Sequence, residues 1–303
     1  AQTGKAWFAV VEARGQVELA EHSAKSFGES AARIQRRFER GVRSSLDVRL
    51  ARTEHANAEA ELAERREVLE HATRALQVLI GTYPDGEVAE RTELPTLPER
   101  IPAGIPADVL SRRPDLVAAE RRLAAADAAL GAAKAARYPT ISLTASGGTR
   151  SDDVADLLDG DFRVWSLAGN VLAPLVDQGR RQAQVDAADA RRYEALATWA
   201  GAVLRALSEV ETHLASATQL ADAETHLDRA SREAAAARDL SGDRYDRGLI
   251  DIVTLLEAQR RDVAARRGLL AMRHRRLANR IDLLLALGGG IPLQPTETEE
   301  TDS

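Results

Sequence analysis

The stretch that decides the fold is Arg244-Tyr245-Asp246-Arg247-Gly248-Leu249-Ile250-Asp251-Ile252-Val253-Thr254-Leu255-Leu256-Glu257-Ala258-Gln259-Arg260, and a version of it occurs earlier in the chain. The earlier copy, 207 positions upstream, is Arg37-Phe38-Glu39-Arg40-Gly41-Val42-Arg43-Ser44-Ser45-Leu46-Asp47-Val48. At the same offset and without a gap, Leu76-Gln77-Val78-Leu79-Ile80-Gly81 aligns with Leu283-Leu284-Leu285-Ala286-Leu287-Gly288. Two matches at one offset indicate a tandem duplication, and we predict that each half is built around a helical hairpin.

Each copy predicts a sharp turn between two long helices. Gly41 and Gly248 stand where one helical pattern stops, as expected of a residue that is free to adopt a positive φ. Asp251 is a good N-cap for the helix that follows, and Ser44, with Asp47 three residues on, caps the earlier helix in the manner of a capping box. One copy alone would suit an ordinary helical hairpin. A turn kept in both halves indicates instead a contact that is repeated at the two tips.

The composition favours long helices over a wide globular core. Of the 303 residues 44% are hydrophobic, many of them Ala, and only 4% are aromatic, whereas a wide core needs large side chains. The net charge is −6, with Lys and Arg scattered among Asp and Glu, so nothing resembles the basic footprint of a nucleic-acid-binding protein. Cysteine is absent, which excludes disulfides, thiolate metal sites and a thiol nucleophile from these residues. No apolar run approaches the ~18 residues of a membrane-spanning helix.

In the first half we predict two long helices, Lys5 to Glu39 and Leu46 to Ile80. Each is roughly 50 Å long at ~1.5 Å per residue, a length that favours coiled-coil packing. A connector with five prolines follows and extends to residue 106. We therefore assign residues 1–106 to the first repeat, as a helical hairpin plus connector, and residues 107–290 to the second.

The second repeat begins with a helix and then changes period. Arg112-Arg113-Pro114-Asp115 opens the helix, since Pro114 suits a first turn and Asp115 the positive end of the dipole, and Tyr138-Pro139 stops it. Thr140 to Ser146 alternates between polar and apolar residues and predicts a strand. A second strand is predicted from Trp165 to Leu175, so a β-hairpin occupies about 140–176. The strand lengths and the terminal aromatic residues suit tilted transmembrane β-strands, and a small soluble β-ribbon is the alternative.

Two further helices complete the second repeat, from Arg180 to Arg244 and from Asp251 to Leu287, and Gly288-Gly289-Gly290 ends the last one. The tail at 291–303 is acidic, carries two prolines and is predicted to be disordered. The predicted fold class is therefore mainly α, with long coiled-coil-like hairpins, an internal twofold repeat and one β-hairpin.

The sequence carries no recognisable catalytic or metal-binding pattern. Its six histidines are dispersed on predicted helices, and no pair has metal-ligand spacing with a third ligand beside it. Gly288-Gly289-Gly290 follows a helix and precedes Pro292, unlike a phosphate-binding loop. The many Glu and Arg residues are most simply solvated faces and i,i+4 pairs. We predict no enzyme activity, no cofactor and no metal.

With these residues in view, the chain resembles the outer-membrane efflux protein family, the TolC-like channels, and most closely the NodT-type branch that serves resistance–nodulation–division pumps. The similarity extends from about Trp7 to Gly288. The stretches that carry it are Arg112-Arg113-Pro114-Asp115-Leu116 with Ala119 to Ala126, Tyr138-Pro139-Thr140-Ile141-Ser142-Leu143-Thr144 with Gly147, Ala173-Pro174-Leu175 with Asp177, Gly179 and Glu209-Val210-Glu211, and Tyr245 with Gly248 and Leu255-Leu256-Glu257-Ala258-Gln259-Arg260.

The resemblance implies a homotrimer that contacts outer-membrane lipid. Its protomers would contribute strands to one shared β-barrel in the outer membrane and helices to a tunnel across the periplasm. The implied function is passive exit of small molecules delivered by an inner-membrane pump through a periplasmic adaptor, with no nucleic acid involved. The adaptor would dock at the tips, which comprise Arg40, Gly41 and Val42 in the first hairpin and Arg247, Gly248 and Leu249 in the second.

The resemblance also implies a periplasmic gate on the last helix. Val253, Glu257 and Arg260 lie at i, i+4 and i+7 and share one helix face beyond the tip. In a trimer Glu257 would form a ring of three carboxylates, with a collar of Val253 nearer the entrance. The alternative is that Glu257 and Arg260 form an exposed i,i+3 ion pair and nothing more.

Two departures from the family pattern stand out. Val176 replaces the usual bulky aromatic residue after Pro174-Leu175. The hairpin that starts at Thr140 also lacks a first-repeat partner, whose start the offset would place at position −67, before the first residue. Two strands from each of three chains fall short of the ~8 at which known barrels start. We therefore expect roughly 100 or more further residues upstream, with a second strand hairpin, a signal peptide and a lipidation cysteine.

Two competing functions stay open at this point. A channel for type I protein secretion would share the architecture, although Arg112-Arg113-Pro114-Asp115 argues against it. A coiled-coil scaffold that carries the β-hairpin as decoration belongs to a different class and would be extracted from cells without detergent. The exported compound is not encoded in a duct that receives its cargo from a pump.

Overall fold

The computed structural model describes residues 1–87, 93–97, 112–150 and 163–289. The chain divides into two compact units. We call the first, Ala1–Val109 with Leu207–Ser303, the hairpin unit and the second, Leu110–Ala206, the ribbon unit. One long helix, α5 (Arg180–Asp246), contributes to both. The predicted connector is described only in part, and the predicted tail lies outside the described residues.

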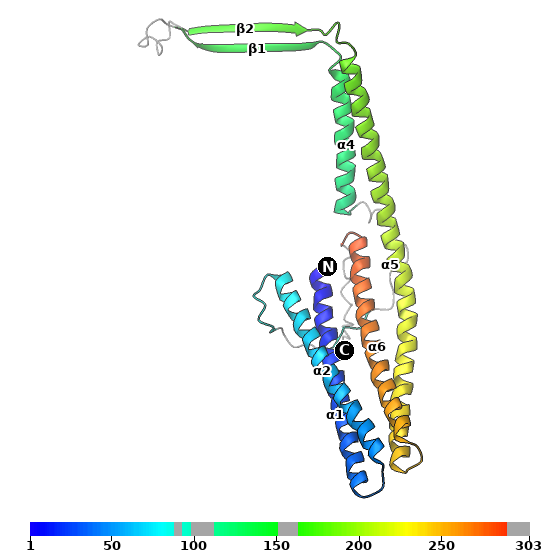
Figure 1. The fold of residues 1–303 in the computed structure, drawn as a ribbon. Helices are drawn as coiled ribbons and strands as arrows, with labels where there is room; N and C mark the ends of the chain where they lie inside the picture. The colour runs from blue at the N-terminus through cyan, green and yellow to red at the C-terminus, as the bar shows by residue number, and fades with distance from the viewer. Residues whose placement is uncertain (88–92, 98–111, 151–162, 290–303) are drawn as a thin grey trace, which may run out of the picture. The chain divides into compact units, whose positions relative to one another are not determined.

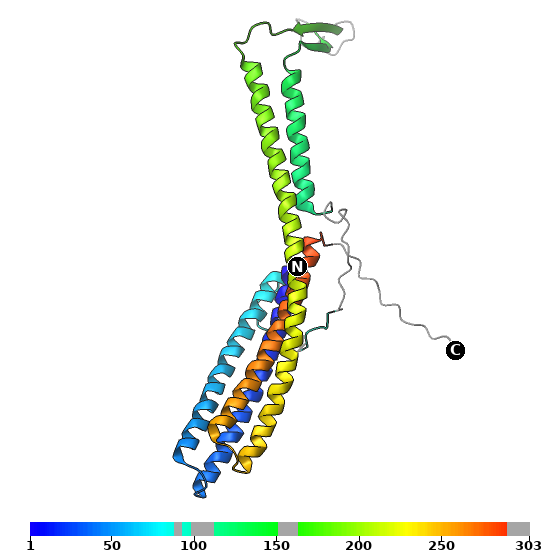
Figure 2. The same cartoon turned by 90° about the vertical axis from the view of Figure 1, so that its right-hand side faces the viewer.

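The hairpin unit contains two helical hairpins whose turns lie at the same end (Figures 1 and 2). The first is formed by α1 (Gln2–Glu39) and α2 (Ser45–Ile80), and the second by the C-terminal part of α5 and α6 (Ile252–Ala286). The N-caps are those predicted, because the Ser44 side chain accepts a hydrogen bond from the Asp47 amide and the Asp251 side chain accepts one from the Thr254 amide. Ser44 and Asp251 are 207 positions apart, so the duplication includes the capping residues.

The repeat is visible in the backbone of the helix ends. Gly41 and Gly248 have φ values of 74° and 75°, and Gly81 and Gly288 have values of 79° and 84°. After each glycine the next amide donates to a carbonyl five residues back, at 2.9–3.0 Å, as in a Schellman motif. These pairs are Val42 with Arg37, Leu249 with Arg244, Thr82 with Gln77, and Gly289 with Leu284. All four helix ends thus obey the same 207-residue offset.

Small side chains allow the helices of the hairpin unit to approach closely. Ala13, Ala20 and Ala31 are buried on α1, and a Cβ added to Gly15 would stand only 2.7 Å from Leu270 on α6. Nearer the tips larger side chains join the two hairpins in one core cluster. Its members include Phe27, Ile34, Val48, Tyr245, Ile252, Leu255 and Leu256.

The ribbon unit combines two helical segments with a two-stranded sheet. Helix α4 (Pro114–Ala135) packs on the N-terminal part of α5 through Leu130, Val185 and Ala188, and Arg192 Nε lies 2.6 Å from Asp127 Oδ1. The sheet pairs β1 (Thr140–Thr149) and β2 (Arg163–Leu172) in antiparallel register from Thr140↔Leu172 to Thr149↔Arg163. Every residue of both strands is exposed in the single chain.

The register divides the ribbon into two different faces, because paired residues in an antiparallel sheet share a face. One face is apolar over four pairs, Ile141↔Val171, Leu143↔Gly169, Ala145↔Leu167 and Gly147↔Trp165, and ends in the polar pair Thr149↔Arg163. The opposite face is largely polar and carries Thr140↔Leu172, Ser142↔Asn170, Thr144↔Ala168 and Ser146↔Ser166, the last pair joined by a 2.8 Å hydroxyl contact. The alternation predicted for 140–146 therefore extends across both strands.

The fold class predicted from the sequence is confirmed, and three strand boundaries are wrong. The first strand continues to Thr149 and does not stop at Ser146, and the second begins at Arg163 and not at Trp165. The second strand also ends at Leu172 and not at Leu175. Pro174 explains the early end, because it has no N–H for the ladder and restricts the residue before it. Among the described residues, no helix combines the length and the apolar character that crossing a membrane requires.

Candidate functional site

The two tips present the side chains that the sequence assigns to docking. Val42 is 67% exposed and Leu249 is 68% exposed, and both directly follow their positive-φ glycines. Arg40 and Arg247 are exposed as well. Open space surrounds the position of an added Cβ at both Gly41 and Gly248. Each tip therefore offers the same motif, a cationic residue, a glycine and a bare apolar side chain.

Tyr245 fixes the second tip against the first hairpin. It is 2% exposed and belongs to the core cluster that joins the hairpins. The Arg43 guanidinium lies 4.3 Å from the ring centroid and that of Arg37 lies 5.7 Å away, both within the range of cation–π attraction. Burial raises the pKa of the Tyr245 phenol, so the ring stays neutral between the two arginines.

Hydrogen bonds from the first hairpin to the end of α5 strengthen this contact. Arg43 Nη2 donates to the Tyr245 carbonyl oxygen at 3.2 Å, and Arg37 Nη2 donates to Asp246 Oδ1 at 2.9 Å. Arg33 Nη1 lies 3.3 Å from Asp246 Oδ2. Three arginines of the first hairpin thus hold the last residues of α5, which orients the turn at Gly248.

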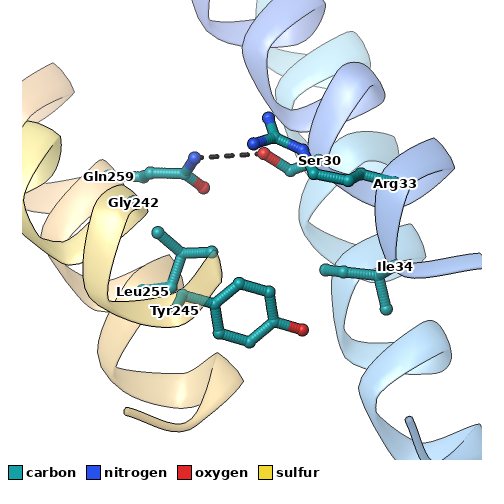
Figure 3. Close-up of a pocket in the computed structure, with 7 residues that line it drawn as sticks. All are labelled: Ser30, Arg33, Ile34, Gly242, Tyr245, Leu255 and Gln259. Carbon is teal, nitrogen blue, oxygen red and sulfur yellow. Dashed lines mark hydrogen bonds between the residues drawn. The ribbon is translucent and has the colours of Figure 1, made fainter. Parts of the chain in front are cut away.

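A small cavity lies directly behind Tyr245 (Figure 3). Its volume is about 40 Å³, and Ser30 and Ile34 line it from the first hairpin while Leu255 and Gln259 line it from the second. The Gln259 amide donates to Ser30 Oγ at 3.1 Å, which links α6 to α1 in the buried interior. Both polar and apolar contacts therefore connect the two hairpins within about three turns of the tip.

The three predicted gate residues lie on one exposed face of α6. Val253 is exposed, and Arg260 Nη2 lies 2.8 Å from Glu257 Oε2, as an i,i+3 pair requires. Arg260 also reaches Glu54 Oε1 on α2 at 3.0 Å, while Arg261 Nε lies 2.8 Å from Glu257 Oε1. Arg260 therefore does more than pair with its own helix, because it also connects α6 to the first hairpin.

Two arginines hold Glu257 in its ionised form. The hydrogen bond from Arg261, and then that from Arg260, lowers the pKa of the Glu257 carboxyl below its ordinary value. The side chain remains partly exposed, so its charge can act on ions in solvent. A carboxyl group with a lowered pKa stays ionised at neutral pH, as the predicted ring of carboxylates would require.

A second arginine–glutamate bridge repeats the first one two turns along the helices. Arg267 of α6 pairs with Glu61 of α2, each seven residues beyond Arg260 and Glu54. Burial alone would raise the pKa of Glu61, but hydrogen bonds from Arg267 and Arg65 lower it. Between the bridges lies an open groove of about 340 Å³. Its lining includes both bridges together with Ser23, Phe27, Ala58, Val263 and Ala264.

The motif Arg112-Arg113-Pro114-Asp115 occupies the start of α4 in the ribbon unit. Arg113 is the N-cap residue and is buried, and it holds the Asp115 carboxylate with two hydrogen bonds, at 3.0 Å from Nε and 2.8 Å from Nη2. The hydrogen bond from Arg113 lowers the pKa of Asp115. The motif thus builds a charged clamp at the helix start, where Pro114 leaves no amide to satisfy.

The sequence missed the partners of Tyr245 and Arg260. No spacing rule connects Arg43 with Tyr245 or Glu54 with Arg260, because these residues are more than 200 positions apart. The repeat offset would pair Glu54 with Arg261, one residue away from its actual partner. No group of three or more His, Asp or Glu side chains within the described ranges is arranged to hold a metal ion.

Comparisons with known proteins agree with this geometry. The profile of the outer membrane efflux protein family matches residues 1–82 and 105–289. The cation efflux system protein CusC of Escherichia coli K12 is 30% identical over 281 residues, which cover 92% of this chain and 61% of that protein. The solvent efflux pump outer membrane protein SrpC of Pseudomonas putida is 33% identical over 275 residues, which cover 90% of this chain and 58% of that protein.

Solved structures give the same result in three dimensions. The open-state crystal structure of the Neisseria gonorrhoeae MtrE outer membrane channel superposes with a TM-score of 0.82 at 32% identity, covering 95% of this chain and 65% of that one. The chain thus spans about three fifths of the length of the curated relatives it matches. The family profile, the relatives and the duplicated hairpins lead to one conclusion: the chain belongs to the outer membrane efflux protein family.

Proposed function

We propose that this protein is the outer-membrane channel of a tripartite efflux system, a passive exit duct for small molecules. It would assemble as a homotrimer, with its strands in the outer membrane and its helices as a tunnel in the periplasm. An inner-membrane pump would deliver the cargo through a periplasmic adaptor. The observation that carries this proposal is the two-faced ribbon, which is exposed on both sides in the single chain.

The ribbon supports a membrane location because its apolar face suits contact with lipid and its polar face suits contact with water. A soluble ribbon would have to expose Ile141, Leu143, Leu167 and Trp165 to water on one face. In a barrel wall the same face contacts lipid, Trp165 lies near one end of the apolar band, and the Ser and Thr face lines the lumen. The amphipathic register thus favours a channel over a scaffold with a decorative hairpin.

The tips support docking of a partner with twofold repeated contacts. Gly41-Val42 and Gly248-Leu249 have the same backbone conformation and expose the same kind of side chain. An adaptor that presents several equivalent copies of one surface could bind both tips of every protomer. The exposed Arg40 and Arg247 would add charge complementarity at the rim of each contact.

The gate of the duct would be formed by Val253, Glu257 and Arg260 of three protomers. In the closed state Arg260 keeps α6 against α2 through Glu54, and opening requires this pair to separate as the tip moves outward. The ring of ionised Glu257 side chains would concentrate cations at the entrance. The two named relatives are described for cations and for solvents, so the pump and not the duct would select the cargo.

The proposal is tested by placing one charge on either face of the ribbon in the complete protein. Leu143→Asp puts the charge toward lipid and should impair membrane assembly and export, since a charge on the lipid face is destabilising, for Asp by less than the ~2–4 kcal/mol of Arg or Lys at the midplane. The adjacent Ser142→Asp puts the same charge toward the lumen and should leave assembly unchanged. Export is measured as drug, metal and solvent tolerance of cells that lack their own channel.

Equal tolerance of both variants would contradict the barrel and favour a scaffold. A scaffold would also be extracted from membranes in buffer without detergent. Export of a protein substrate, with no change in small-molecule tolerance, would favour the type I secretion channel instead.

A further inference from the structure

The two copies of the tip differ in the burial of the residue three positions before the glycine. Tyr245 of the second hairpin is 2% exposed, whereas its repeat equivalent Phe38 is 40% exposed. The backbone around both residues is the same. Gly41 and Gly248 have nearly equal positive φ values, and the amide of each glycine donates a hydrogen bond to the carbonyl of the aromatic residue three positions before it. Phe38 therefore occupies the position of a buried anchor without the surroundings that bury one.

The ion pair beside Tyr245 also has an unused counterpart. Arg37 of the first hairpin binds Asp246 of the second at 2.9 Å. The offset of 207 converts Arg37 into Arg244 and Asp246 into Glu39, so the counterpart keeps one cation and one anion. Both residues are exposed, and Glu39 accepts a hydrogen bond only from Gln35 of its own helix among the contacts of the described residues. Opposite charges have been kept at two places that the single chain leaves facing solvent.

A ring of protomers would explain why a duplicated chain has an opposite-charge pair that stays unpaired within one chain. In a ring each unit contacts the next through two different flanks. Inside this chain the Tyr245 flank of the second hairpin meets the Ile34 flank of the first. The remaining flanks are the Phe38 flank of the first hairpin and the Arg244 flank of the second. Because the hairpins are copies, these two flanks are the repeat equivalents of the two flanks that already pack together inside the chain. We therefore expect them to be complementary to each other.

We propose that Phe38 and Glu39 of one protomer dock against Arg244 and Ile250 of the next protomer, so that a second copy of this chain covers the exposed anchor. The proposal rests on the ring assembly of the proposed function. Arg244 pairs with the neighbouring Glu39 as Arg37 pairs with Asp246 inside the chain, and Ile250 takes the place of Arg43 over the aromatic ring.

This interface between protomers is weaker than the interface between the two hairpins of one chain. Ile34, which packs in the core with Tyr245, corresponds to Ser241, and Arg43, which covers Tyr245, corresponds to Ile250. The interface between protomers thus loses an apolar anchor and a cation–π contact while it keeps one ion pair.

The test uses two differently tagged copies of the complete protein, each with one cysteine, produced in the same cells. One copy carries Glu39→Cys and the other Arg244→Cys, so only a link between protomers can join both tags. A short bifunctional maleimide is used, because an arginine–glutamate pair spans more than the ~3.8 Å between Cβ atoms of a disulfide. The expected product is a dimer that carries both tags. The matched control places Arg37→Cys and Asp246→Cys on separate copies and should give no such dimer.

A charge exchange provides the second measurement. Glu39→Arg should accelerate subunit exchange between trimers roughly two- to five-fold, the effect of losing one exposed ion pair, and adding Arg244→Glu should restore the parent rate. A trimeric protein that gives no two-tag dimer, or a double variant that exchanges as fast as the single one, overturns the inference. If the mass of the complete protein in detergent is that of a monomer, the proposed function is overturned as well. Failure of the contact between protomers can therefore be distinguished from failure of the proposed trimeric channel.

Discussion

The two tips have one backbone and two different environments. Gly41 and Gly248 differ by one degree in φ, and both helices that follow begin with a side-chain cap at the same repeat position. Yet Tyr245 is buried under two arginines, and Phe38 is left exposed. The comparison teaches that a helix end is determined by a few neighbouring residues, whereas the burial of its anchor depends on which surface faces it. The predictions below use this contrast, from the largest expected effect on stability to the smallest.

Removal of the two anchors should have very different effects in the protomer. Tyr245→Ala should lower the free energy of unfolding by about 3 kcal/mol, because it empties a buried aromatic site between the hairpins. Phe38→Ala should lower it by less than about 1 kcal/mol, because its ring is partly solvated already. The measurement is thermal or denaturant unfolding of each variant in detergent, under conditions where the subunits are dissociated. Equal losses would mean that the two environments are alike in solution.

Substitution of the tip glycines should have similar effects at both tips. Gly41→Glu and Gly248→Glu each place a Cβ at a positive φ, which costs of order 1 kcal/mol and leaves trimers intact. Efflux should be abolished in both, since the changed surface is the one that we propose the adaptor contacts. The check is in-cell crosslinking to the adaptor together with a trimer assay. Normal crosslinking in Gly248→Glu cells would contradict a docking role for this tip.

The two helix caps should differ in their response to pH. Ser44→Ala should cost about 1 kcal/mol at any pH, because a hydroxyl cap does not titrate. Hydrogen bonding to Thr254 lowers the pKa of Asp251, so its cap contributes stability above the unfolded pKa and loses it as the pH falls through the lower, folded pKa. Asp251→Ala should therefore be destabilising at neutral pH and nearly neutral in acid. Unfolding curves at neutral and acidic pH, with Ser44→Ala as the control, check this difference.

The smallest effect on stability is expected at the gate, where the functional effect is large. Glu257→Ala with Arg260→Ala should raise the open probability of the complete trimer in planar bilayers, and Glu257→Ala alone should reduce block by divalent cations. Because Arg261 and Arg260 lower the pKa of Glu257, the block should persist below the pH at which an ordinary glutamate is protonated. The repeat equivalent of Arg260 is Thr53, and Thr53→Ala provides a matched control on the first hairpin. Parent-like conductance of both gate variants would place the constriction elsewhere and leave Glu257 and Arg260 as an exposed ion pair.

The gate also separates the copies chemically. Glu257 corresponds to Leu50, a partly buried side chain that packs on the core cluster, so only the second hairpin can contribute a carboxylate to a ring. Val253 corresponds to Leu46, and both are exposed. Duplication thus supplied the scaffold twice, while the proposed ring of carboxylates would come from one copy.

Local features of the fold could be predicted from the sequence because they depend on neighbouring residues. Gly41, Ser44, Gly248 and Asp251 define turns and caps through contacts within a few positions. The alternation at 140–146 defined the first strand and its two faces for the same reason. The boundary of the second strand was placed too late because Pro174 was included in an apolar run.

Contacts between the two hairpins could not be predicted in this way. The sequence by itself determined a duplicated pair of capped helical hairpins and an amphipathic strand, because helix ends and strand faces follow from short-range periodicity. Only the tertiary structure decided that Arg43 covers Tyr245, that Arg260 reaches Glu54 and that Phe38 stays exposed. These facts depend on how two separately encoded surfaces meet, and no spacing along the chain specifies which of two equivalent side chains another surface will bury.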